Sequence, residues 1–108
     1  MNMLRGIRHE RAKVMLSLET SQQRIELCES ALEQLKRIRM TGLPETVRCV
    51  YDYDDELTFN IDRTLVDSEY LAVMEFLVEH QENVKRARAE LSRLREREEA
   101  LLNAGHHE

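Results

Sequence analysis

Residues 66–101 have the sequence VDSEYLAVMEFLVEHQENVKRARAELSRLREREEAL, and this stretch decides the fold predicted for the chain. One set of positions recurs at spacings of four and three residues, and nine of its eleven members are apolar. A row so narrow is typical of a helix that packs lengthwise on another helix. The positions of this second seam are Val66, Tyr70, Val73, Leu77, His80, Val84, Ala87, Leu91, Leu94, Glu98 and Leu101.

The N-terminal part of the chain carries a first seam with the same spacing, and eight of its eleven positions are apolar. Gly42 and Pro44 supply a left-handed cap and a stop, so we expect one helix over 3–40. Thr64 can cap a second helix over 64–104, which Gly105 ends. The positions of the first seam are Leu4, Ile7, Arg11, Val14, Leu18, Ser21, Ile25, Cys28, Leu32, Leu35 and Arg39.

Between the two helices, apolar and polar residues alternate over 46–62, which predicts a β-hairpin. Its turn is predicted at Asp54, Asp55 and Glu56, and residues 105–108 are expected to form a tail. The predicted fold class is therefore mainly α. One domain over residues 1–108 has two long antiparallel helices, a coiled-coil hairpin, joined by one β-hairpin.

Folding the chain back at a bend near residue 54 makes specific pairs of seam positions face each other. Arg11 is expected close to Glu98, as an ion pair that helps to fix the register. Ser21 is expected opposite Ala87, where two small residues allow the helices to approach closely.

Length and composition predict that this helical hairpin has a partner. The chain has 108 residues, of which 34% are charged and 5% aromatic, as in coiled coils. A lone pair of helices has little interior. We therefore expect a homo-oligomer, most simply of two copies, or a complex with another protein.

The charge is unevenly distributed. Residues 41–83 hold eleven acidic and two basic residues, a net charge of −9, whereas the whole chain carries −5. The simplest interpretation is that these carboxylates are solvated and have no specific function. A functional one is that the acidic end imitates nucleic-acid phosphates and blocks a nucleic-acid-binding protein. The net charge argues against direct binding of nucleic acid.

No pattern of a catalytic, cofactor-binding or metal-binding site is recognised in the sequence. Cys28 and Cys49 are expected to be reduced, since no disulfide framework is present. His80, on the second seam, is expected to be a neutral packed imidazole, with a pH-sensitive seam as the alternative. No apolar run could span a membrane and no secretory signal is recognised, so a cytoplasmic location without membrane contact is expected.

The order of helix, single hairpin and helix within one short chain resembles the beta-type subunit of prefoldin. The resemblance is one of layout and covers nearly the whole chain. It implies that the helices form a tentacle and that the hairpin joins a barrel made by several subunits. It also implies client binding near the free helix ends, around Met3 and Leu102.

The leading hypothesis is a non-enzymatic, oligomeric coiled-coil protein that binds another protein, as a chaperone-like subunit or as an assembly or accessory factor. The alternative is an acidic inhibitor of a nucleic-acid-acting enzyme, such as a phage-encoded antagonist of a nuclease or defence complex. Stability is expected to depend on Leu18, Ile25, Leu32, Leu77, Val84 and Leu91. The residues expected to bind the partner, or to associate with other copies, are Tyr51, Tyr53, Asp54, Asp55, Glu56 and Phe59.

Overall fold

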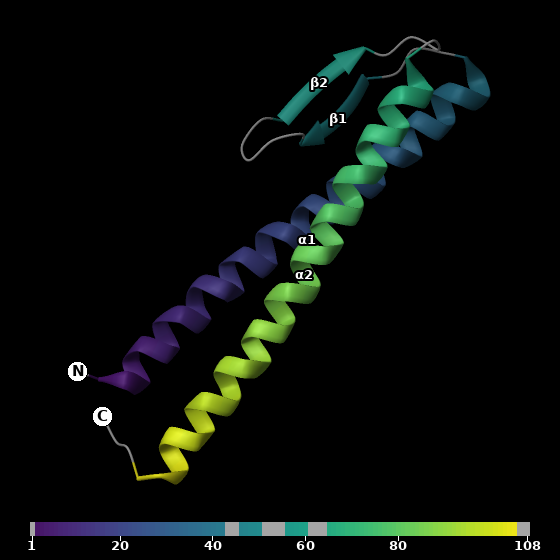
Figure 1. Cartoon of the computed structure of the whole chain (residues 1–108). Helices are drawn as coiled ribbons and strands as arrows, with labels where there is room; N and C mark the ends of the chain where they lie inside the picture. Colours follow the sequence, from purple (N-terminus) through teal and green to yellow (C-terminus); the bar gives the residue numbers. More distant parts are fainter. Residues whose placement is uncertain (1, 43–45, 51–55, 61–64, 106–108) are drawn as a thin grey trace. The chain divides into compact units, whose positions relative to one another are not determined.

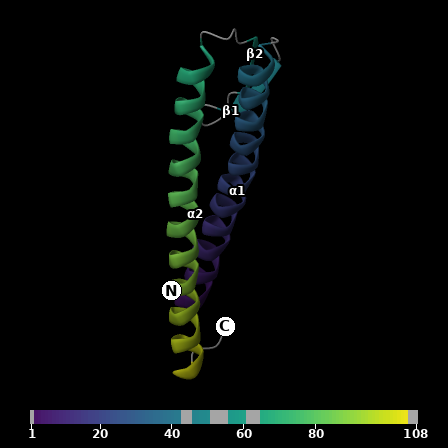
Figure 2. The same ribbon diagram turned by 90° about the vertical axis from the view of Figure 1, so that its right-hand side faces the viewer.

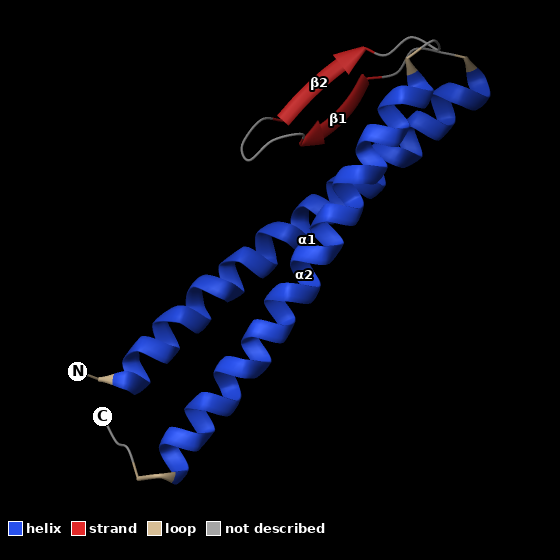
Figure 3. Ribbon diagram, viewed as in Figure 1, coloured by secondary structure: helices blue, strands red, loops and turns tan. Residues whose placement is uncertain are grey.

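The computed structural model describes residues 2–42, 46–50, 56–60 and 65–105, and for the two middle ranges the backbone alone. Two long helices dominate it, α1 at Met3–Thr41 and α2 at Val66–Asn103 (Figures 1 and 3). The predicted helices are confirmed, with ends that differ by one or two residues. Thr64, the residue predicted to cap α2, lies outside the described residues.

Glycines end both helices in the left-handed conformation. Gly42 has a φ of 69° and its N–H donates to the Ile38 carbonyl at 2.8 Å. Gly105 has a φ of 82° and donates to the carbonyl of Leu102 at 3.1 Å. Both predicted stops are confirmed, because only glycine adopts this conformation without steric cost.

The chain divides into two compact units, and each helix contributes to both of them. Unit 1 comprises Met1–Ser21 and Glu82–Glu108, and unit 2 comprises Gln22–Gln81. Within each unit the segments of α1 and α2 run antiparallel side by side (Figures 1 and 2). The layout is that of a two-helix antiparallel hairpin, as predicted.

Unit 2 has a continuous hydrophobic core between its two helical segments. Leu35 and Val73 are fully buried, and Ile25, Tyr70 and Phe76 pack against the cluster from its margins. The buried members are Cys28, Ala31, Leu32, Leu35, Ile38, Val66, Val73 and Leu77. Ala31, at 0% exposure, is completely enclosed by its neighbours in this core.

Unit 1 has fewer fully buried residues. Leu4 and Ile7 on α1 and Val84 and Leu94 on α2 are buried. Ser21 and Ala87 are also buried, and their opposition to each other stays a prediction. Three expected stability residues are only half-buried, namely Leu18 and Leu91 in this unit and Ile25 in unit 2.

The predicted seams are confirmed except at the end of α1. Arg39 was expected on the first seam but is exposed, whereas Ile38 is 1% exposed and joins the core. A straight helix drifts by about 20° in each heptad, so a strict seven-residue repeat does not stay on one face. The apolar neighbour replaces Arg39 in the core, and the guanidinium stays at the rim, 3.6 Å from the Asp67 carboxylate.

Two strands lie between the helices in the sequence, β1 at Thr46–Val50 and β2 at Glu56–Asn60 (Figure 3). They pair antiparallel, with Val50 opposite Glu56 and Val47 opposite Phe59. Glu56 was predicted in the turn, but it is the first residue of β2.

Candidate protein-binding surface

A second apolar row runs along α2 in unit 2, away from the core. Leu71, Met74 and Val78 are 65%, 37% and 52% exposed, and their spacing of three and four residues places them on one face. This face lies about a third of the way round the helix from the buried Val73 and Leu77. We call these three residues the α2 outer stripe.

Carboxylates lie at one end and along one edge of the α2 outer stripe. Asp67 precedes Leu71 by one turn, and Glu75 and Glu79 follow one edge of the stripe; all three are exposed. Asp67 also receives the guanidinium of Arg39 at 3.6 Å. Unit 2 as a whole holds thirteen acidic and six basic residues, a net charge of −7. The stripe is therefore an apolar surface with carboxylates at one end and along one edge.

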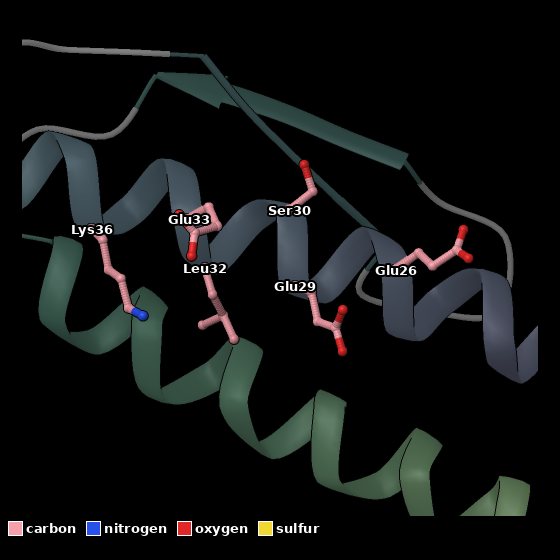
Figure 4. A pocket seen from close by; sticks show the side chains of 6 residues that line it. All are labelled: Glu26, Glu29, Ser30, Leu32, Glu33 and Lys36. Carbon is pink, nitrogen blue, oxygen red and sulfur yellow. The ribbon is translucent and has the colours of Figure 1, made fainter.

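An open groove on α1 adds to this acidic character. Figure 4 shows Leu32 and Lys36 pointing toward α2, whereas Ser30 points away from it. Three carboxylates and one ammonium group thus lie within about three turns of one helix. The residues that line the groove are Glu26, Glu29, Ser30, Leu32, Glu33 and Lys36.

In unit 1, polar residues meet across the helix pair at the predicted place. Arg11 donates through Nη1 to Oε2 of Glu98 at 2.7 Å, and Nε of Arg8 lies 3.6 Å from Oε1 of the same carboxylate. The Glu98 side chain is only 14% exposed. The predicted pairing of Arg11 with Glu98 is confirmed, and it fixes the antiparallel register of this unit.

We expect the Arg11–Glu98 pair to contribute a coupling free energy of about 0.5–1 kcal/mol, since it is partly shielded from water. A double-mutant cycle with Arg11→Ala and Glu98→Ala, measured by urea unfolding, gives this value. The Arg93–Glu90 pair, which lies within α2 and does not join the two helices, is the matched control and should couple more weakly. A cross-helix coupling no larger than that of the control would contradict the register role.

His80 is a buried titratable group of unit 2. The residue is 7% exposed, and its ring stacks on that of Phe76 with the ring centroids 6.4 Å apart. The Nδ1 atom of His80 has no hydrogen-bond partner among the described residues. Burial lowers the pKa of His80 below its ordinary value of 6.5; Arg24 lowers it further, and Glu79 opposes the shift. The folded state therefore favours the neutral imidazole, as the sequence predicted.

This shift of the His80 pKa predicts how stability depends on pH. Below about pH 6.5 the His80 imidazole binds a proton more readily in the unfolded chain than in the folded one. The free energy of unfolding should therefore decrease as the pH falls from about 7.5 to about 5.5. In His80→Gln this part of the decrease should vanish. Urea unfolding at several pH values tests it, with the exposed His9→Gln as control. An unchanged pH dependence in His80→Gln would refute the assignment.

Most predicted partner-binding residues cannot be compared with the structure. Tyr51, Tyr53, Asp54 and Asp55 lie outside the described residues. Glu56 and Phe59 are in β2, of which the backbone alone is described. These assignments remain predictions. The α2 outer stripe was not predicted, although its spacing is visible in the sequence.

No helix in the described ranges is both long and apolar enough to cross a lipid bilayer. Within the same ranges, no three histidine, cysteine, aspartate or glutamate side chains are grouped as metal ligands would be. Comparisons of the chain with protein-family models, with curated proteins and with solved structures found no match.

Proposed function

We propose that this chain is a non-enzymatic protein that binds another protein, and that unit 2 carries the binding surface. The observation that supports this most is the α2 outer stripe. Leu71, Met74 and Val78 are large, aligned and exposed on a helix that already packs through a different face. Covering apolar surface stabilises a complex by about 25 cal/mol per Å², so such a row favours association with a partner.

Within this class, a chaperone-like subunit or an assembly or accessory factor agrees best with the layout of the chain, which resembles that of a prefoldin beta-type subunit. Self-association is the second part of the proposal. Leu18 and Leu91 in unit 1 are half-buried, so another copy can complete their burial. The hairpin residues Tyr51, Tyr53 and Phe59 are proposed to contribute to the same assembly.

The experiment is site-specific photo-crosslinking in cells of the native host. A photoreactive amino acid at position 74 should yield a crosslinked protein, whereas the same amino acid at the exposed position 15 in unit 1 should not. The double variant Leu71→Ser/Val78→Ser should abolish the crosslink from position 74 without lowering the melting temperature. No crosslink specific to position 74, in either an intermolecular or a self-crosslinked form, would refute binding at unit 2.

The alternative function is an acidic inhibitor of a nucleic-acid-acting enzyme, and the net charge of −7 on unit 2 favours it. In that case Glu26, Glu29 and Glu33 would take the place of phosphates. Raising the ionic strength from about 0.05 to 0.5 M should then weaken binding of the captured partner sharply, because salt screens exposed charges. Binding through the α2 outer stripe should weaken much less, because salt does not screen its apolar contacts, and duplex DNA should not compete with it.

A further inference from the structure

We propose that the α2 outer stripe binds an amphipathic helix of another protein, one whose apolar row is bordered by lysine and arginine. This rests on the proposed function and names the chemistry of the partner. Two observations carry it, the geometry of the stripe and the sign of the charge around it.

The geometry favours a helix as the occupant. Leu71, Met74 and Val78 span two turns of α2, about 10 Å, on a regular helical face. An amphipathic helix presents apolar side chains at the same spacing of three and four residues, so the two rows can interlock as in a coiled coil. The occupant would add a third helix to unit 2.

The charges select the kind of helix. Asp67 lies at one end of the stripe, Glu75 and Glu79 lie along one edge, and all three are exposed. Lysine and arginine flanking the incoming apolar row would lie near these groups, which favours both association rate and specificity. A helix with acidic flanks would meet charges of the same sign.

The same charges argue against a second copy of this chain in a contact of stripe with stripe. In an antiparallel contact the edges that carry Glu75 and Glu79 would lie on the same side of the interface, so these carboxylates would face those of the other copy. Like charges at an interface oppose association. Self-association through the seam residues of unit 1 is not affected by this argument.

The experiment measures binding of designed peptides to the purified full-length chain by fluorescence anisotropy. Three peptides of about 20 residues are compared, long enough to form a helix on binding. One has a leucine row flanked by lysine and arginine, one has the same row flanked by glutamate, and one has the basic composition in scrambled order. We expect the basic patterned peptide to bind at least about tenfold more tightly than either of the others.

Variants of the chain locate the site. Leu71→Ser/Val78→Ser should weaken binding of the basic peptide at least about tenfold, whereas Leu16→Ser, at a residue equally exposed in unit 1, should not change it. Leu71 is 65% and Leu16 is 66% exposed, so the two substitutions remove comparable apolar surface. Glu75→Lys/Glu79→Lys should reverse the preference, so that the glutamate-flanked peptide binds better.

Equal binding of the patterned and scrambled peptides would overturn the proposal, because charge alone would then account for the affinity. An unreversed preference in Glu75→Lys/Glu79→Lys would also overturn it. So would sedimentation showing that the chain self-associates and that Leu71→Ser/Val78→Ser abolishes this, since a second copy would then occupy the stripe. If no peptide binds but the crosslink from position 74 persists, the inference fails and the proposed function stands.

Discussion

Replacing Leu35 by alanine is expected to lower the free energy of unfolding by about 2–5 kcal/mol. Leu35 is fully buried in the core of unit 2, between the helical segments that carry Leu32 and Val73. Truncation removes the γ carbon and both methyl groups of leucine from this contact and leaves a cavity that the surrounding helices fill only partly. The total free energy of unfolding of a domain is about 5–15 kcal/mol, so this loss is a large fraction of it.

Urea unfolding followed by circular dichroism measures this loss. Met40→Ala is the control, because Met40 lies on the same helix but is 86% exposed, and it should change the free energy of unfolding by at most about 0.5 kcal/mol. Ile25→Ala and Leu91→Ala should fall between the two, since both residues are half-buried. Equal effects of Leu35→Ala and Met40→Ala would show that unit 2 does not have this core.

The second large effect is expected from an enlargement, Ala31→Leu. This change adds apolar surface, yet it should destabilise the chain by about 1–3 kcal/mol, because Ala31 is 0% exposed in the core of unit 2 and a larger side chain would overpack it. The additional atoms can be accommodated only by displacing α2 or by adopting a strained rotamer. The melting temperature should fall accordingly.

Ala100→Leu is the matched control for Ala31→Leu, since Ala100 is exposed near the end of α2. It should change stability by only a few tenths of a kcal/mol, the difference in helix propensity between the two residues, about 0.2 kcal/mol. A rise in stability for Ala31→Leu would mean that the helices are farther apart at Ala31 than the core of unit 2 requires.

The sequence predicted the helices and their pairing because both depend on a long, regular repeat and on strong stop signals. Gly42 and Gly105 end the helices where the sequence placed the stops, and Arg11 meets Glu98 as the fold-back required. The Arg39 prediction was wrong because a rigid heptad does not follow the drift of a straight helix, and Ile38 lay one residue away.

The binding surface was harder to predict because it depends on what remains uncovered. Leu71, Met74 and Val78 form only a short row beside a much longer seam, and their spacing alone does not distinguish a second face from a widened first face. Their exposure in the folded chain makes the distinction. The assignment of Tyr51 and Tyr53 to a binding surface depended on residue type, which does not determine how side chains pack.

Because Cys28 is buried, the reaction of its thiol with an added reagent reports local opening of the fold. Cys28 is 1% exposed inside the core of unit 2, so thiol reagents reach its sulfur only when α1 and α2 separate there. In a background of Cys49→Ser, the alkylation rate therefore measures how often the helices part without complete unfolding. Occupation of the α2 outer stripe by a partner should slow this reaction, so that labelling kinetics can follow binding without an attached dye.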